Sequence, residues 1–375
     1  MNEAEHNSVD ERFMTAALKL AQSGKGSVEP NPMVGALIVR DGQELSRGFH
    51  RIYGGRHGEI EALRAAERAG LDVRGATMYV TLEPCCHYGK TPPCTDAIIA
   101  AGISRVVVAM ADPDDHVSGK GIRQLVEAGI KVNLGICRRQ AEKILAPYRK
   151  LRKTLRPWVI CKWAQTSDGF LALPPSAGRW ISCPQSRRRV HEIRAQVDGI
   201  LVGIGTVLAD DPLLTNRSGG GAQPVRIVLD SDLRIPVQCQ LTNTPAVSQV
   251  IVATTVGTPA RKAHKANRLH QKGVDLVEIL SGDNGLVSLP DLLDQMGKRG
   301  WMNLLVEGGP KVLASFVEGS FADELIAFVS PDPAPVGAEG MPKFDIADVG
   351  ERVRAVDRSE SQCGSDKILR LVLRD

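Results

Sequence analysis

The sequence predicts an α/β protein of two domains, and three observations support this expectation. At 375 residues the chain exceeds the size of one ordinary domain. Short apolar runs rich in β-branched residues alternate with helical patterns along both halves, which is typical of α/β proteins. A basic polar stretch at residues 148–157 lies between the halves. We interpret it as a solvated linker, and therefore expect one domain over 1–150 and another over 151–375.

The first half contains four helical patterns and four strand patterns. Gly70 and Gly102 directly follow two of the helical patterns, where glycine commonly ends a helix. We expect helices at 11–21, 59–69, 95–101 and 122–128, and strands at 33–40, 76–82, 105–110 and 130–134. This alternation predicts a layer of parallel strands covered by helices.

The second half repeats the alternation. Strand patterns occur at 158–162, 199–202, 225–229, 250–253 and 303–306. Three consecutive glycines at 219–221 predict a flexible loop tip, and a segment rich in proline and glycine at 331–342 predicts the last long loop. We therefore expect a second α/β domain.

Composition and charge describe an ordinary globular protein. Hydrophobic residues make up 43% of the chain and charged residues 24%, values that suit a protein with a packed core. The formal net charge of +4 is too small to indicate nucleic-acid binding. No segment approaches the roughly 18–20 consecutive apolar residues of a membrane span, and the polar N-terminus lacks the pattern of a signal peptide. We expect a cytoplasmic protein without nucleic-acid or membrane partners, whose eight cysteines are free thiols or metal ligands.

The strongest functional signal is a set of metal-ligating residues in the first half. His57 and Glu59 form a His-x-Glu element, and Cys85 and Cys94 follow the strand pattern at 76–82. Zinc deaminases carry a His-x-Glu element and a later pair of cysteines. One imidazole and two thiolates supply three protein ligands and leave a fourth position for water, as a catalytic zinc site requires. The sequence therefore predicts a zinc site formed by His57, Cys85 and Cys94.

Glu59 has the position of an acid/base group rather than of a ligand. Zinc lowers the pKa of its bound water to roughly 7, and a carboxylate beside it can take a proton from that water and return it to the substrate. A purely structural zinc site is the alternative, with Cys86 or His87 as the fourth ligand. That alternative leaves Glu59 without a role.

Two motifs in the second half are candidate phosphate-binding sites. The glycine pattern at 203–205 lacks the third glycine of a dinucleotide fingerprint, and a tight turn is the better interpretation. At 307–311 (EGGPK) a strand runs into two glycines and a helix, whose backbone N–H groups suit a phosphate or pyrophosphate. An ordinary glycine-rich turn fits this motif equally well. Asp210 and Asp211 precede a proline, which is also common in turns.

Several motifs together resemble the bifunctional riboflavin-biosynthesis deaminase/reductase family. In the first half the resemblance rests on 30–35 (PNPMVG), 48–50 (GFH), 57–59 (HGE) and 81–94 (TLEPCCHYGKTPPC). In the second half it rests on 179–182 (RWIS), 206–215 (TVLADDPLLT), 225–230 (VRIVLD) and 306–310 (VEGGP). The long insertion between the two cysteines distinguishes this family from cytidine and nucleic-acid deaminases. The resemblance implies a cytidine-deaminase-like three-layer domain followed by a dihydrofolate-reductase-like α/β domain.

The resemblance also implies two successive reactions and their participants. A diaminopyrimidinone carrying a phosphoribosylamino group loses ammonia to give the aminouracil, and NADPH then reduces the ribose to ribityl. The implied cofactors are Zn²⁺ and NADPH, the substrate is a phosphorylated pyrimidine, and we expect a homo-oligomer. Cofactor contacts are implied at Ala164, Trp180, Thr206, Asp210, Gly309, Pro310 and Lys311. Substrate contacts are implied at Asn31, His50, His87, Lys90, Arg194, Leu214, Arg217 and Glu307.

Two other functions remain open from the sequence. A nucleic-acid deaminase would use the basic stretch at 148–157 to hold a strand, but the chain has only 4% aromatic residues with which to stack bases. Alternatively, the second half is a non-catalytic dimerisation domain beside a monofunctional deaminase. The departures from the family pattern at Ser167, Gly178 and 331–337 support that possibility.

Overall fold

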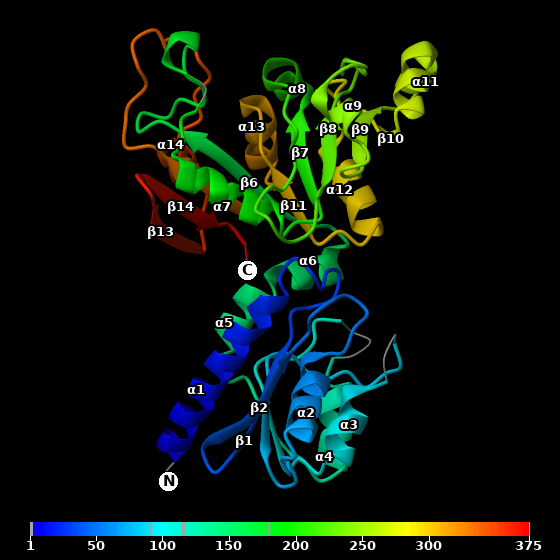
Figure 1. Ribbon diagram of the computed structural model, residues 1–375, viewed down its shortest axis with the longest axis vertical. Coiled ribbons are helices and arrows are strands. Elements are labelled where there is room, and N and C mark those ends of the chain that lie inside the picture. The colour runs from blue at the N-terminus through cyan, green and yellow to red at the C-terminus, as the bar shows by residue number, and fades with distance from the viewer. Residues whose placement is uncertain (1–2, 90–91, 115–117, 179, 375) are drawn as a thin grey trace. The chain divides into compact units, whose positions relative to one another are not determined.

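The chain folds into two compact units, which are described separately. The computed structural model describes residues 3–89, 92–114, 118–178 and 180–374. One unit comprises Met1–Leu155 and the other Arg156–Asp375. In Figure 1 the first unit is blue to teal and the second green to red.

The first unit is built on a mixed five-stranded sheet among the described residues. Its strand order is β2-β1-β3-β4-β5. The strands are β1 (Gly35–Arg40), β2 (Gln43–Phe49), β3 (Thr77–Val80), β4 (Arg105–Val108) and β5 (Lys131–Leu134). The predicted parallel arrangement holds for β3, β4 and β5. The prediction is wrong for β1, which pairs antiparallel with both β2 and β3. The turn at Asp41 and Gly42 returns the chain into β2, so β1 and β2 form a hairpin. Strand β2 was not predicted from the sequence.

Helices cover both faces of this sheet and give the expected three layers. They are α1 (Glu3–Ala21), η1 (Gln22–Gly24), α2 (Gly58–Arg68), α3 (Cys94–Ala100), α4 (Lys120–Glu127), α5 (Arg138–Ile144) and α6 (Ala146–Thr154). Figure 1 shows α1 and α5 on one face and α2, α3 and α4 on the other. The four predicted helices correspond to α1, α2, α3 and α4, and are confirmed.

Two glycines allow helices to lie directly on the strands. A Cβ atom at Gly35 would lie 2.2 Å from the backbone oxygen of Ala17 in α1. A Cβ atom at Gly48 would lie 2.2 Å from the backbone nitrogen of Ala62 in α2. Any side chain at Gly48 would therefore push away the helix that begins beside His57.

The sequence predicted a solvated linker at 148–157, and this prediction is wrong. The first seven residues of this stretch belong to α6, and Tyr148 and Leu151 are buried. Basic residues lie between and after these two buried residues, which is the pattern of an amphipathic helix. The expected boundary at residue 150 falls inside α6, five residues before the end of the first unit.

The second unit is built on a nine-stranded sheet among its described residues. The strand order is β10-β9-β8-β7-β11-β6-β12-β14-β13. The strands are β6 (Trp158–Gln165), β7 (Gly199–Gly203), β8 (Val225–Leu229), β9 (Val250–Thr255), β10 (Val274–Ile279), β11 (Asn303–Val306), β12 (Glu324–Val329), β13 (Asp357–Cys363) and β14 (Asp366–Val372). The sheet is parallel from β10 to β12 and antiparallel at β14 and β13. The five predicted strands are β6, β7, β8, β9 and β11.

The order of these strands reverses next to β6. The chain moves outward from β7 to β10 and then returns to place β11 between β7 and β6. In open parallel sheets, ligands bind beyond the carboxyl ends of the strands at such a reversal. The carboxyl ends of β6, β7 and β11 therefore mark the expected binding edge of the second unit.

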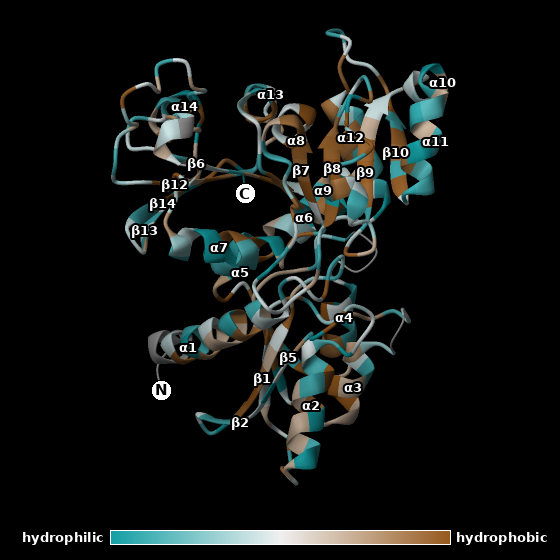
Figure 2. Ribbon diagram, turned by 45° about the horizontal axis from the view of Figure 1, so that its top comes forward, coloured by the Kyte–Doolittle hydropathy of each residue, from teal (hydrophilic) through white to brown (hydrophobic). Residues whose placement is uncertain are grey.

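Helices cover the second sheet, and a long loop closes one end of β6. The helices are η2 (Pro175–Ala177), α7 (Pro184–Arg194), α8 (Ile204–Asp210), α9 (Gln240–Asn243), α10 (Thr258–Arg261), α11 (Ala263–Gln271), α12 (Leu289–Lys298), α13 (Pro310–Glu318) and α14 (Ile346–Arg352). Figure 2 shows the apolar strands in brown and the more polar surface of α7 and α11 in teal. The predicted loop at 331–342 contains neither helix nor strand. It is tied to the turn after β6 by backbone hydrogen bonds from Ser167 to Asp332 and from Leu171 to Pro342.

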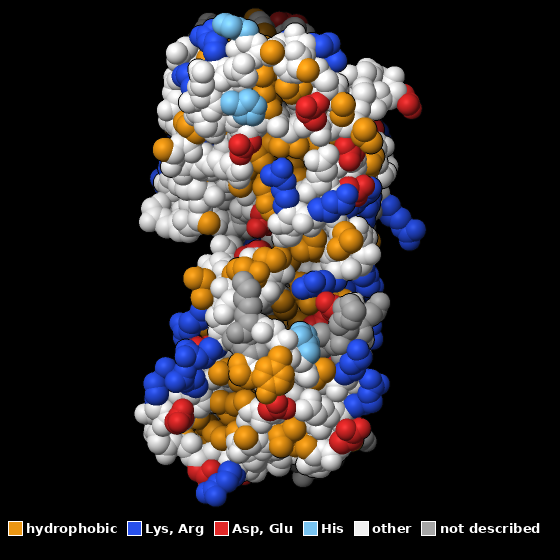
Figure 3. Space-filling view, turned by 90° about the vertical axis from the view of Figure 1, so that its right-hand side faces the viewer, with side chains coloured by type: hydrophobic (Ala, Val, Ile, Leu, Met, Phe, Trp, Pro, Cys, Tyr) orange, Lys and Arg blue, Asp and Glu red, His pale blue; other side chains and the backbone are white. Residues whose placement is uncertain are grey.

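The surface is mixed in charge, and no helix in the described ranges has the length and hydropathy needed to cross a bilayer. Figure 3 shows positive and negative side chains interspersed over both units, with hydrophobic groups between them.

Adding a methyl group at Gly48 tests the close contact between β2 and α2. We expect Gly48→Ala to lower the free energy of unfolding by about 1–3 kcal/mol, the usual cost of overpacking. Chemical denaturation measures this change. Gly220→Ala is the control, because a Cβ atom there has no neighbour within 4 Å. Equal stability of the two variants would contradict the close contact.

Candidate active site

Three side chains of the first unit converge to form a candidate metal site. The ligand atoms of His57, Cys85 and Cys94 all lie within 4.8 Å of one another. The Nδ1 atom of His57 is 3.5 Å from the Sγ atom of Cys85 and 3.4 Å from that of Cys94. One nitrogen and two sulfur donors are the ligand chemistry that zinc prefers.

The local fold explains why residues so distant in sequence meet. His57 is the residue that caps the N-terminus of α2, and Cys94 is the first residue of α3. Cys85 follows the carboxyl end of β3, where the chain turns between these helices. The backbone N–H of Cys94 points at the Sγ atom of Cys85 across 3.4 Å, so the start of α3 stabilises negative charge on that sulfur.

The electrostatics of the cluster favour a thiolate at one cysteine. The hydrogen bond from Cys94 and the proximity of His57 lower the pKa of the Cys85 thiol to about 4. The hydrogen bond between the side chains of Cys85 and Cys94, together with burial, raises the pKa of the Cys94 thiol well above its ordinary value. A divalent cation shared by both sulfurs would stabilise both as thiolates.

Glu59 lies in the first turn of α2 and is only 2% exposed. Its Oε2 atom is buried and has no hydrogen-bond partner among the described residues. Burial raises the pKa of the Glu59 carboxyl to about 7. A carboxyl group with this pKa can both accept and donate a proton near neutral pH, as an acid/base catalyst must.

The residues that could have completed a four-ligand structural site do not join the cluster. Cys86 and His87 are both described, and neither belongs to the group of converging ligand atoms. His87 is exposed. The arrangement is therefore a site with three protein ligands, and it fits a catalytic zinc ion better than a structural one.

Two of the implied substrate residues lie next to the metal cluster. The rings of His50 and His57 meet edge to face, with their centroids 5.2 Å apart. The Nε2 atom of His50 is 3.4 Å from the Nδ2 atom of Asn31, and its Nδ1 atom is 2.9 Å from the backbone oxygen of Arg56. Burial lowers the pKa of His50, which favours the neutral ring. Lys90, a further implied substrate residue, lies outside the described residues.

Glu83 organises this site, although the sequence analysis gave it no role. Its carboxylate is buried and accepts hydrogen bonds from four backbone N–H groups, those of Asp112, Gly119, Gly121 and Ile122, at 2.9–3.3 Å. It thereby fixes the start of α4 next to the turn that carries Cys85. Its place two residues before Cys85, inside the motif at 81–94, was the sequence signal that could have identified it.

The implied cofactor residues of the second unit gather at the carboxyl edge of its sheet. Helix α8 follows β7 and contains Thr206 and Asp210, while α13 follows β11 and begins with Pro310 and Lys311. The backbone N–H of Gly203 donates to the oxygen of Gly308, which joins the two turns. A Cβ atom at Gly309 would lie 3.2 Å from the Oγ1 atom of Thr206, whereas Gly308 and Gly205 face open space. Bare backbone at this edge fits a phosphate-bearing cofactor.

The other two implied cofactor residues differ in position. Ala164 lies near the carboxyl end of β6 and is partly buried. Trp180 is 60% exposed, and the guanidinium carbon of Arg187 lies 4.9 Å from the centre of its ring. Trp180 is therefore not a core residue.

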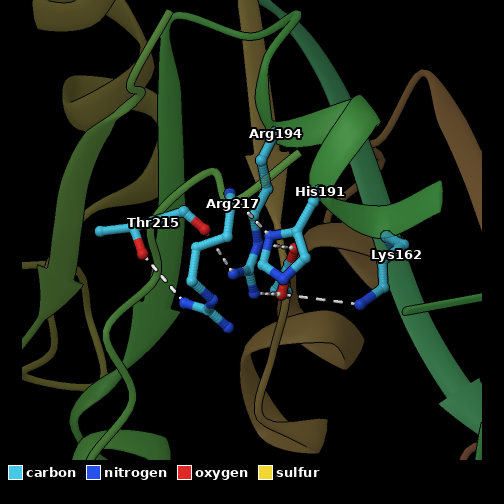
Figure 4. A network of polar contacts seen from close by, with 6 residues as sticks. Lys162, His191, Arg194, Thr215 and Arg217 are labelled. Carbon is cyan, nitrogen blue, oxygen red and sulfur yellow. Dashed lines mark hydrogen bonds and ion pairs between the residues drawn. The ribbon is translucent and has the colours of Figure 1, made fainter. Parts of the chain in front are cut away.

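A buried charge network lies at the same edge, between β6, α7 and β11 (Figure 4). Arg194 makes two hydrogen bonds to the carboxylate of Glu307, at 3.0 and 2.7 Å. Lys162 lies 3.6 Å from the same carboxylate and is only 9% exposed. Burial alone would raise the pKa of Glu307, but Arg194 and Lys162 outweigh it and lower that pKa to about 2. Lys162 was missed because a lysine inside a strand pattern resembles an exposed residue.

This network changes the interpretation of the two arginines. Two of the guanidinium nitrogens of Arg194 bind Glu307, and a third donates to the backbone oxygen of Thr215. Arg194 is therefore engaged within the protein. Arg217 is exposed, and its guanidinium donates to the Oγ1 atom of Thr215. Leu214, a further implied substrate residue, is buried.

Each unit matches the model of a known protein family. Residues 7–110 match the family model of the cytidine and deoxycytidylate deaminase zinc-binding region. Residues 157–365 match the family model of the RibD C-terminal domain. The two models thus divide the chain in the same order as the two units.

Relatives and solved structures cover almost the whole chain. The riboflavin biosynthesis protein RibD of Aquifex aeolicus is 40% identical over 352 residues, which are 94% of this chain and 93% of its own. The Escherichia coli RibD protein is 36% identical over 345 residues, with 88% and 90% covered. The structure of Acinetobacter baumannii RibD superposes with a TM-score of 0.83 at 34% identity, over 98% of this chain and 100% of that one. A Thermotoga maritima structure described as a diaminohydroxyphosphoribosylaminopyrimidine deaminase and 5-amino-6-(5-phosphoribosylamino)uracil reductase gives the same TM-score and identity, with 98% and 99% covered.

The first unit holds a cluster of three candidate metal ligands, and the second unit has a sheet edge lined by glycines. Together with similarity along nearly the full length, these features show that the chain belongs to the RibD family of bifunctional riboflavin-biosynthesis deaminase/reductases.

Proposed function

We propose that the first unit hydrolyses an amino group from a phosphoribosylamino-substituted diaminopyrimidinone, and that the second unit then reduces the ribose of the product with NADPH. The observation that carries the first reaction is the buried Glu59 carboxyl beside three converging ligand atoms. The observation that supports the second is bare backbone beside a charge network at one sheet edge.

In the first reaction, water adds to the ring carbon that carries the amine, and the bond from carbon to nitrogen breaks to release ammonia. A zinc ion held by His57, Cys85 and Cys94 would act as a Lewis acid that lowers the pKa of water to about 7. Glu59 accepts one proton from the water and delivers it to the ring nitrogen. It then takes a second proton from the hydroxyl group of the adduct and delivers it to the leaving amine, so that the hydroxyl becomes the carbonyl of the product. Asn31 and His50 lie at the edge of this cluster, where their polar atoms can orient the ring.

In the second reaction, the open form of the ribose gains a hydride and a proton and becomes a ribityl chain. NADPH supplies the hydride when it is bound. Thr206 and Asp210 on α8, and residues 309–311 at the start of α13, are the proposed contacts of the cofactor. Arg217 is the proposed contact of the substrate phosphate, since Arg194 is held by Glu307. Glu307, which pairs with Lys162, is the proposed contact of the sugar hydroxyl groups.

A monofunctional deaminase with a non-catalytic second unit is the competing function. The departures at Ser167 and 331–337 lie in a turn and a loop that bind each other through backbone atoms, so they do not remove a side chain of the proposed cofactor site. Product mass with and without NADPH separates the two functions, because only the bifunctional enzyme adds two hydrogens to the deaminated product.

Removing one ligand tests the metal site. We expect about one zinc per chain in the wild type and a large loss of zinc in Cys94→Ala, because two remaining ligands bind the ion poorly. Metal analysis of the purified proteins measures both. Cys86→Ala is the matched control and should keep its zinc. Full retention of zinc by Cys94→Ala would show that another residue is a ligand.

Replacing the carboxylate tests the proton transfer. Glu59→Gln should keep its zinc and lose deamination by roughly 10²–10⁴-fold, because an amide cannot carry protons between water and substrate. Ammonia release measures this loss. The same variant, given substrate that is already deaminated, should consume NADPH at the wild-type rate. Near-normal ammonia release would remove Glu59 from the mechanism.

A pair of variants tests the second unit. Arg217→Ala should raise the KM for the phosphorylated substrate about 10-fold or more, because a charge-assisted hydrogen bond contributes roughly 1.5–3 kcal/mol. NADPH binding by this variant should stay near that of the wild type. Asp210→Ala should show the opposite pattern. Fluorescence titration with NADPH and steady-state kinetics measure the two effects, and identical behaviour of both variants would contradict the assignment.

A further inference from the structure

Helix α4 holds the segment that carries the first cysteine. The carboxylate of Glu83 binds the N-terminal backbone of α4 through Gly121 and Ile122. A Cβ atom at Gly121 would lie 2.1 Å from the backbone oxygen of Pro84, so α4 is packed directly against the residue before Cys85. A displacement of the start of α4 would therefore move this turn.

The same helix also holds the segment that carries the second cysteine. Gln124 of α4 accepts a hydrogen bond from the hydroxyl of Thr95 at 2.9 Å and donates to the carboxylate of Asp96 at 2.8 Å. The hydroxyl of Thr95 is also 3.3 Å from the backbone oxygen of Cys85. Both cysteines of the candidate metal site are thus positioned against α4.

Residues 112–114, which precede α4 in the chain, are held by a buried carboxylate and a tyrosine. Asp112 is 7% exposed, and its backbone N–H is one of the donors to Glu83. Its carboxylate accepts hydrogen bonds from the backbone of Asp114 at 2.9 Å and from the hydroxyl of Tyr148 at 3.2 Å. Tyr148 is itself buried and belongs to α6, the helix that ends the first unit.

A second residue of α6 acts on the same segment. The guanidinium of Arg152 lies 3.6 Å from the carboxylate of Asp114 and 5.3 Å from the centre of the Tyr148 ring. No part of α6 supplies a metal ligand or an acid/base group. Two of its side chains, Tyr148 and Arg152, nonetheless contact Asp112 and Asp114, which precede α4.

We propose that Tyr148 is a positioning residue for deamination, which acts through Asp112 and α4 on the two cysteines of the metal site. This inference rests on the proposed function of the first unit. It means that α6 completes the deaminase site, although the basic sequence of this helix resembles a linker. It also gives the buried Asp112 a function in a cluster that contains no ligand or catalytic group.

The test compares full-length variants that lose one hydroxyl group each. Tyr148→Phe removes the bond to Asp112. Tyr79→Phe is the matched control, because Tyr79 is equally buried and its hydroxyl donates to another buried carboxylate, that of Asp10, at 2.8 Å. Asp112→Asn and the double variant with Tyr148→Phe complete a double-mutant cycle. The measurements are zinc content, the kcat and KM of deamination, the rate of reduction, and the absorption spectrum of the cobalt-substituted proteins.

We expect Tyr148→Phe to lower the kcat of deamination at least 10-fold and to change the cobalt–thiolate absorption bands. Zinc content and the rate of reduction should remain at wild-type values. The double variant should lose no more activity than the worse single variant, because both changes break one connection. Tyr79→Phe should stay within twofold of the wild type in kcat and keep the wild-type spectrum.

Three results would overturn the inference. The first is a Tyr148→Phe variant whose deamination kcat stays within twofold of the wild type and whose cobalt spectrum is unchanged. The second is an equal loss of kcat in the Tyr79→Phe control. The third is a double variant in which the losses of the two single variants multiply. Failure of the wild type to deaminate is a different outcome and would contradict the proposed function. The cobalt spectra of Tyr148→Phe and Tyr79→Phe would then still decide whether Tyr148 positions the cysteines.

Discussion

Both candidate sites depend on one constraint, which is that neighbouring parallel strands end at the same edge of a sheet. In the first unit the carboxyl end of β3 leads into the turn that carries Cys85. In the second unit the carboxyl ends of β7 and β11 lead into α8 and α13, and the glycines between them leave the backbone bare. Helices that follow such strands direct their N-terminal N–H groups at this edge, where they stabilise negative charge. This property suits thiolates in the first unit, and it would suit phosphate groups in the second.

The two units stabilise buried charge in different ways. Glu83 is stabilised by four backbone N–H groups, and it holds the start of α4, which packs against Pro84, the residue before Cys85. Glu307 is stabilised by Arg194 and Lys162, which keep its pKa at about 2 despite burial. Because the four donors around Glu83 are neutral backbone groups, they add no full positive charge beside the metal site. The cations around Glu307 leave a positive balance beside Arg217, which suits an anionic substrate.

Much of the deaminase site was predictable because its chemistry is local in sequence. His57 and Glu59 share one turn of a helix, and Cys85 and Cys94 flank one loop. The organising residues were not predictable to the same degree. Glu83, Asp112 and Tyr148 are ordinary polar residues whose function comes from partners 29–39 residues away along the chain. Lys162 likewise gains its role only through the register of β6 with β11.

The sequence by itself determined the α/β class, the family and the three converging residues of the candidate metal site, and it singled out Glu59 as the candidate acid/base group, because each depends on residue type and short spacing. Only the tertiary structure decided that β1 runs antiparallel to β3, that 148–154 is a packed helix, and that Arg194 is engaged by Glu307. Strand direction and ion pairing depend on which distant segments meet. An amphipathic helix and a solvated linker share a basic composition, and they differ only in whether a surface exists to bury the two apolar side chains.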